Sequence, residues 1–242
     1  MGGYRITSTA VALLVAAGCG TDRPVAPSPA QTIPGSGPVA AVIAVVSGAD
    51  QSGKAGEPLT DPFVVRVTDE YGSPVPNITV SFHVASGAGA LAGRCDGDVR
   101  SAQTTADGTA PMTFQPSVLG RSAVIARISG RPEPSVTFTT EATVLVIDFW
   151  FGFWNVGFVG PCSNAGDVTV PVGTPVEWRI PVQDDRYPVT YTVTSTATPP
   201  GAGGFDSGML TAYERFRFVP LVAGTWEYRD RVTGLAGTLT AR

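Results

Sequence analysis

Residues 62–84 read PFVVRVTDEYGSPVPNITVSFHV, and this stretch decides the fold class. Residues 62–69 and 78–84 each alternate apolar and polar side chains with a period of two, as half-buried β-strands do. Between them, residues 71–76 (YGSPVP) have the glycine and prolines that are typical of a turn. The stretch therefore predicts two strands joined by a turn.

The same period of two continues on both sides, and no window has a helical stripe of useful length. The segment Ala106-Asp-Gly108 predicts a tight hairpin turn between the strands that flank it. About seven short strands at this spacing are typical of a β-sandwich. Besides the first two, the predicted strands are Val42–Val46, Ser101–Thr105, Thr109–Phe114, Ala123–Ile128 and Ser135–Thr140.

Three stretches of this region resemble a known family: SGADQSGKAGEPLTDPFVVRVTDEYGSPVPNITVSFHVASGAGAL, TTADGTAPMTF and VTFTT. They are similar to the bacterial Ig-like domain of group 1, the repeat module of invasin and intimin. The resemblance covers residues 39–142, which we call the first module. It implies a rigid spacer or presenting surface and no enzymatic activity. The single copy departs from the long rods of the invasins.

Residues 143–242, which we call the second module, are again strand and turn. The segments VPVGTPVEW, YTVTS, FDSGML, FRFVPLVAGTWEYRD and GLAGTLTAR resemble the cupredoxin, or blue-copper, fold. We therefore expect an all-β chain with two Greek-key β-sandwiches in tandem, the first Ig-like and the second cupredoxin-like.

The resemblance to cupredoxins provides a test for copper, because a blue-copper site needs two imidazoles, a thiolate and a weak axial thioether. Carried over by motif, the ligand positions hold Tyr191 and Thr233 for the histidines, Asp230 for the cysteine and Leu235 for the methionine. One carboxylate is too little charge for a hard-cation site. The sequence therefore predicts no copper, no metal and no cofactor, and it disfavours a redox function.

The chain has one histidine, His83, on the face opposite Phe82 and Val84, and we expect it to point to solvent. No nucleophile-elbow motif is present, so nothing pairs this base with a nucleophile. Loop carboxylates do not have the spacing of a calcium loop, and we interpret them as turn residues; they are Asp96, Asp98, Asp184 and Asp185. The sequence therefore predicts a protein that is not an enzyme.

The segment Leu145–Trp154 is unusually aromatic, and on a strand Trp150 and Trp154 share one face. They form either an exposed platform for sugar rings or a partner, or a surface that packs against the first module or against a covering loop such as Val156–Asn164.

Cys95 and Cys162 also leave two alternatives. They pair in a disulfide, which an exported compartment permits, or they remain two free thiols.

The N-terminus is a targeting segment. Residues 1–18 have one early positive charge and the short apolar stretch Ala10–Ala17, and they end in small residues directly before Cys19. This junction resembles a bacterial lipobox, which implies that Cys19 is lipidated; the alternative is an ordinary secretory signal. Residues 19–38 contain five prolines and predict an extended tether.

The amino-acid composition limits which functions are possible. The formal net charge is −4, which argues against a nucleic-acid partner. We expect a lipid-anchored protein of the bacterial cell envelope, at the outer membrane, with the membrane as one partner. Its expected role is adhesion, protein interaction or presentation. The alternative is a polysaccharide-binding accessory module, for which the glycan partner would contact Trp150 and Trp154.

Overall fold

The computed structural model describes residues 39–94, 97–150, 153–155, 166–180 and 190–242; side chains are described for all of these except residues 150 and 153–155. The described residues form strands, turns and loops, and they include no helix that is long and apolar enough to span a membrane. The expected all-β sandwich class is confirmed.

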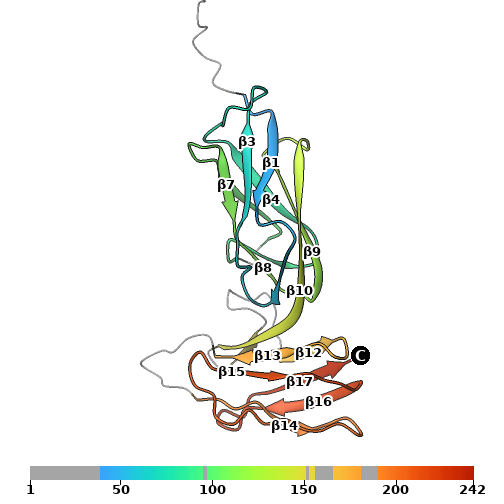
Figure 1. Ribbon diagram of the computed structural model, residues 1–242. Coiled ribbons are helices and arrows are strands. Elements are labelled where there is room, and N and C mark those ends of the chain that lie inside the picture. Colours follow the sequence, from blue (N-terminus) through green and yellow to red (C-terminus); the bar gives the residue numbers. More distant parts are fainter. Residues whose placement is uncertain (1–38, 95–96, 151–152, 156–165, 181–189) are drawn as a thin grey trace, which may run out of the picture. The chain divides into compact units, whose positions relative to one another are not determined.

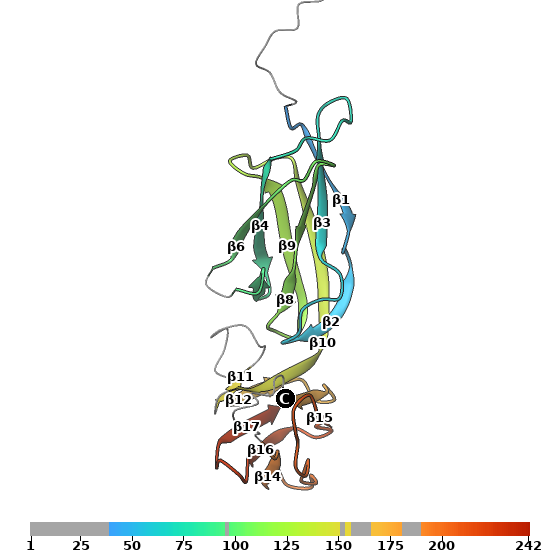
Figure 2. The ribbon, with the colours of Figure 1, turned by 90° about the vertical axis from the view of Figure 1, so that its left-hand side faces the viewer.

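Two sheets build the first module (Figures 1 and 2). One sheet has the order β1-β3-β7, the other runs β10-β9-β4-β6, and β5 and β8 form a small separate pair. The strands are β1 (Val42–Ser47), β2 (Gln51–Ala55), β3 (Phe63–Thr68), β4 (Thr79–Ser86), β5 (Gly89–Leu91), β6 (Val99–Gln103), β7 (Thr109–Met112), β8 (Phe114–Pro116), β9 (Gly120–Ile128) and β10 (Ser135–Trp150).

The turn at residues 106–108 forms, but the predicted hairpin is wrong. The amide of Gly108 donates to the carbonyl of Thr105, and Gly108 has a φ of 77°, which glycine adopts without strain. However, β6 pairs with β4 and β7 pairs with β3, so the turn carries the chain from one sheet to the other. A tight turn within a hairpin and a tight turn between two sheets have the same local sequence features, so the sequence does not distinguish them.

The second module also has two layers. One layer is the four-stranded sheet β12-β17-β16-β14. The other layer continues the larger sheet through β10-β13-β15, and β11 pairs with residues 148–150 of β10. The strands are β11 (Phe153–Asn155), β12 (Asp167–Val170), β13 (Val176–Arg179), β14 (Thr194–Ala197), β15 (Arg215–Phe218), β16 (Gly224–Arg229) and β17 (Ala236–Ala241).

Strand β10 belongs to both modules. Residues 135–142 pair with β9, residues 145–148 pair in parallel with β13, and β2 pairs in parallel beside residues 140–145. The expected boundary between residues 142 and 143 therefore falls inside one uninterrupted strand.

Each module has its own apolar core, built from the inward face of alternating strands. Stacked phenylalanines, Phe63, Phe114 and Phe138, lie in the first core. The second core contains Trp178 and Trp226, both almost fully buried, with Ala55 and the partly buried Leu119 of the first module packed against it.

Candidate functional site

The positions that a cupredoxin would use for copper lie together at one end of the second module. Tyr191 precedes β14 and forms a bridge with Leu210, and Asp230 directly follows β16. Thr233 and Leu235 lie in the loop before β17. The amide of Asp230 donates to the carbonyl of Leu235 at 2.8 Å, and this bond closes the loop.

The carboxylate of Asp230 is fully buried and bound by protein donors on both oxygens. Oδ1 accepts the amides of Thr192 at 2.8 Å and Val232 at 3.1 Å. Oδ2 accepts the amide of Thr233 at 2.8 Å and its hydroxyl at 2.6 Å. Burial by itself raises the pKa of Asp230, but these hydrogen bonds outweigh it and hold the pKa below its usual value.

These residues do not fit copper. Among the described residues the site offers no imidazole or thiolate, and its one carboxylate already accepts protein hydrogen bonds on both oxygens. Burial, and secondarily the charge of Asp230, raises the pKa of Tyr191, so its phenol stays protonated at neutral pH. Within the described part of the chain, no three His, Cys, Asp or Glu side chains converge as a metal site. Asp230 acts here as the anchor of its loop.

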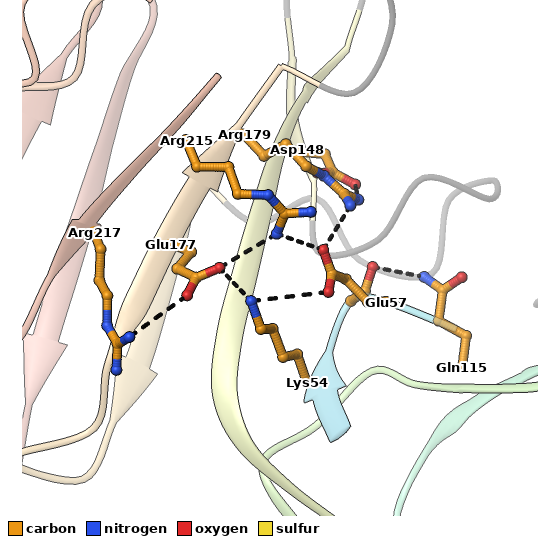
Figure 3. Close-up of polar contacts among 9 residues, drawn as sticks. Lys54, Glu57, Gln115, Asp148, Glu177, Arg179, Arg215 and Arg217 are labelled. Atoms are coloured by element: carbon orange, nitrogen blue, oxygen red, sulfur yellow. Dashed lines mark hydrogen bonds and ion pairs between the residues drawn. The ribbon is translucent and has the colours of Figure 1, made fainter. Parts of the chain in front are cut away.

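A second polar site lies where the two modules meet, and we call it the junction cluster (Figure 3). It consists of Lys54 and Glu57 from the first module and of Asp148, Glu177, Arg179 and Arg215 from strands β10, β13 and β15. Lys54 Nζ lies 2.7 Å from Glu177 Oε2, and Glu57 Oε1 lies 2.6 Å from both Arg179 Nη1 and Arg215 Nη1.

Asp148 is the innermost member of the junction cluster and is fully buried. Arg179 donates to both of its carboxylate oxygens, from Nε at 2.7 Å and from Nη2 at 2.8 Å. Burial raises the pKa of Asp148, and the two-point contact with Arg179 opposes this shift. Burial also acts to raise the pKa of Glu177, but hydrogen bonds from Lys54 and Arg215 lower it overall.

Sequence reasoning missed the junction cluster, although a signal was present. Asp148 interrupts the apolar run from Val144 to Phe149, and Glu177 and Arg179 flank the core residue Trp178. Charges in buried strands need partners. The partner of Asp148, which is Arg179, lies 31 residues away in the sequence. Glu177 and Arg179 have their partners, Lys54 and Glu57, more than 120 residues away, so no local pattern identifies them.

His83 lies opposite Phe82 and Val84 as expected, but the expectation that it points freely to solvent is wrong. It is half-buried, and its Nδ1 is buried without a hydrogen-bond partner. The ring lines a pocket with Ser81, Val99, Arg127 and the turn at residues 130–132. Neighbouring strands and this turn cover a side chain that an isolated strand would expose.

Other predicted sites fall wholly or partly outside the described residues. The predicted single strand through Trp154 is wrong, because β10 ends at Trp150 and β11 pairs back on it in antiparallel register, with Trp154 opposite Phe149 and Phe153 opposite Trp150. Trp150 and Trp154 are therefore not neighbours on the same face of one strand, and their side chains are not described. Cys19, Cys95 and Cys162 also lie outside, so lipidation and the disulfide stay predictions. The same holds for Asp96, Asp184 and Asp185, whereas Asp98 is an exposed residue before β6.

The fold and these sites define a two-module β-sandwich protein. Residues 44–141 match the family described as bacterial Ig-like domain (group 1). No curated protein matches the sequence.

Solved structures of amicyanin are similar over part of the chain. A reduced Cu(I) mutant form of amicyanin at pH 4 has 16% sequence identity and a TM-score of 0.33. The aligned part covers 41% of the present chain and 82% of the amicyanin chain. An oxidized mutant has 18% identity and a TM-score of 0.32 over the same shares.

Proposed function

We propose that this chain is a non-catalytic, lipid-anchored protein of the bacterial cell envelope, and that it presents a binding surface to a partner. An Ig-like domain and a cupredoxin-like sandwich are both typical of interaction modules. Fold alone does not fix function, so the proposal depends on how the two modules are joined.

The observation that carries the proposal is the shared strand β10 together with the junction cluster. A flexible linker between modules leaves their geometry free. Here one strand is hydrogen-bonded into both modules, and ion pairs join Lys54 and Glu57 to β13 and β15. Such a connection suits a protein that holds a surface at a fixed geometry.

The Asp230 loop supports the non-catalytic part of the proposal. At the place where a cupredoxin binds its metal, this chain has a closed set of protein hydrogen bonds. A buried network in which every member is satisfied rigidifies a loop. The loop therefore suits a structural or recognition role better than electron transfer.

Membrane anchoring is tested by fractionating cells that express the full chain or the Cys19→Ser variant. We expect the wild type in the membrane fraction with a labelled acyl chain, and the variant unlabelled and outside that fraction. Protease treatment of intact cells, compared with lysed cells, then tells which face of the envelope carries the modules. Equal membrane association of both proteins would contradict the proposed anchor.

A further inference from the structure

Strand β6 is an open edge of the larger sheet. It pairs with β4 on one side and ends the described sheet on the other, and Figure 2 shows it at the margin beside β4. Open edges are templates for strand addition unless prolines, lysines or bulges block them. Strand β6, Val99–Gln103, contains no proline and no lysine.

The register of β4 with β6 shows which backbone groups of β6 do not bond to β4. The amide of Val84 donates to Asp98 O, and the amide of Thr104 donates to Ile78 O, so even-numbered residues make the bonds to β4. The odd-numbered residues Val99, Ser101 and Gln103 direct their N–H and C=O groups outward. All three are exposed, and by this register their N–H and C=O groups do not bond to β4. Arg100 Nη1 donates to Val99 O, so the outward groups open to a new strand are the amide of Val99 and the backbone groups of Ser101 and Gln103.

A cationic pocket of about 310 Å³ adjoins this edge. Ser81 and His83 of β4, Val99 of β6, Arg127 of β9 and Arg131 line it. Arg131 donates to the carbonyl of Ala40, and Arg127 has no carboxylate partner among the described residues.

The nearby carboxylates do not close this pocket. Glu133 accepts from Ser135, and Asp98 is an exposed residue before β6. Val99 belongs to both the edge and the pocket, so a long side chain of a peptide paired with β6 can extend over Val99 toward His83, whose Nδ1 is buried without a partner, and toward Arg127 on β9, two strands from β6.

We propose that β6 takes up an extended acidic segment of a partner protein by strand addition, with a carboxylate of that segment in the pocket of His83 and Arg127. Backbone hydrogen bonds give affinity in this mode, and side-chain pockets give specificity. The positive charge of the pocket favours an acidic segment over a second copy of this chain, whose identical pocket would repel it. This inference deepens the proposed function by naming the surface and the kind of partner.

The test selects binders for the full mature chain from a library of random nonapeptides. We expect the selected peptides to be acidic and to shift the amide resonances of Val99, Ser101 and Gln103. Ser101→Pro removes an outward donor without breaking a bond to β4, and it should weaken binding about tenfold or more. Arg127→Gln should weaken binding about tenfold as well.

The matched control is Arg121→Gln, which removes an exposed arginine from the same strand and the same face as Arg127, six residues away, and should leave affinity unchanged. If Ser101→Pro does not fold, Gln103→Pro replaces it. Peptides that bind wild type and edge variants equally, no enrichment at all, or a dimer formed through β6 would each overturn the proposal. None of these results would affect the Cys19 test of anchoring.

Discussion

Asp230 shows how one buried carboxylate can organise a loop through hydrogen bonds. Its carboxylate accepts backbone amides from Thr192, Val232 and Thr233, which lie on both sides of the site. These bonds hold together two segments that are at least 38 residues apart in the sequence, residue 192 and residues 230–233.

Asp230→Asn tests this role. The amide keeps the shape but places N–H donors against N–H donors, and we expect the free energy of unfolding to fall by about 2–3 kcal/mol in urea titrations. Glu227→Gln, on the exposed face of β16, is the matched control and should change it by less than about 0.5 kcal/mol. Similar losses in both variants would contradict the anchoring role.

The contribution of Asp230 to stability should depend on pH in a definite direction. The folded pKa of Asp230 lies below that of an unfolded aspartate, about 3.9. Its contribution to stability is therefore fully present above that value, and it is lost as the pH falls through the folded pKa. We expect the stability difference between wild type and Asp230→Asn to shrink between about pH 5 and pH 2. A stability difference that grows on acidification would mean that folding raises the pKa of Asp230, and would contradict this prediction.

The same residues predict the response to copper. Protein incubated with Cu²⁺ and desalted should retain much less than one equivalent and show no intense visible band, because thiolate and imidazole ligands are absent from the site. Metal analysis and absorption spectra check this directly. Stoichiometric copper with an intense band would refute it.

At the scale of the element, β10 is the central feature. Its first half follows the alternation of an Ig-like strand, and its second half carries Asp148 into the core region of the second module. A fully buried carboxylate is stable there because Arg179 on the neighbouring strand binds it at two points. The strand and its ion pair therefore depend on each other.

Arg179→Met leaves Asp148 buried without its main partner, so we expect the variant to lose about 3–5 kcal/mol of unfolding free energy. The double variant Asp148→Leu with Arg179→Met removes both charges and should recover a large part of that loss. Urea unfolding of the two variants and the wild type measures this. A double variant as unstable as the single one would mean that packing, not the ion pair, is responsible.

The existence of most strands was predictable from the sequence, whereas their partners were not. The alternation at residues 62–69 and 78–84 predicts β3 and β4 because side-chain direction is local. The turn at residues 106–108 looks like a hairpin because its own residues do not encode which sheet receives β7. The contacts of Glu57 with Arg179 and Arg215 arise from tertiary structure, and so does the covering of His83.

At the scale of the whole described unit, the two modules depend on shared parts. Ala55 and Leu119 of the first module pack against the core that contains Trp178 and Trp226. All four tryptophans of the chain follow residue 149, so tryptophan fluorescence reports on the second module and on the β10–β11 segment. This gives a spectroscopic separation of the two modules.

We expect urea unfolding followed by tryptophan fluorescence to coincide with unfolding followed by the amide signals of Val80 and Phe82 in the first core. Coincident curves follow from the shared strand and the junction cluster. Two transitions with separate midpoints would mean that the modules unfold independently.

We infer that the shared strand β10 and the junction cluster hold the two modules as one unit of fixed geometry. Residual dipolar couplings of backbone amides in the mature chain, prepared as Cys19→Ser without lipid, measure this geometry. We expect the couplings from residues 42–138 and from residues 167–241 to fit one common alignment tensor. Two tensors of different magnitude would show that the modules reorient independently, and would contradict a fixed geometry.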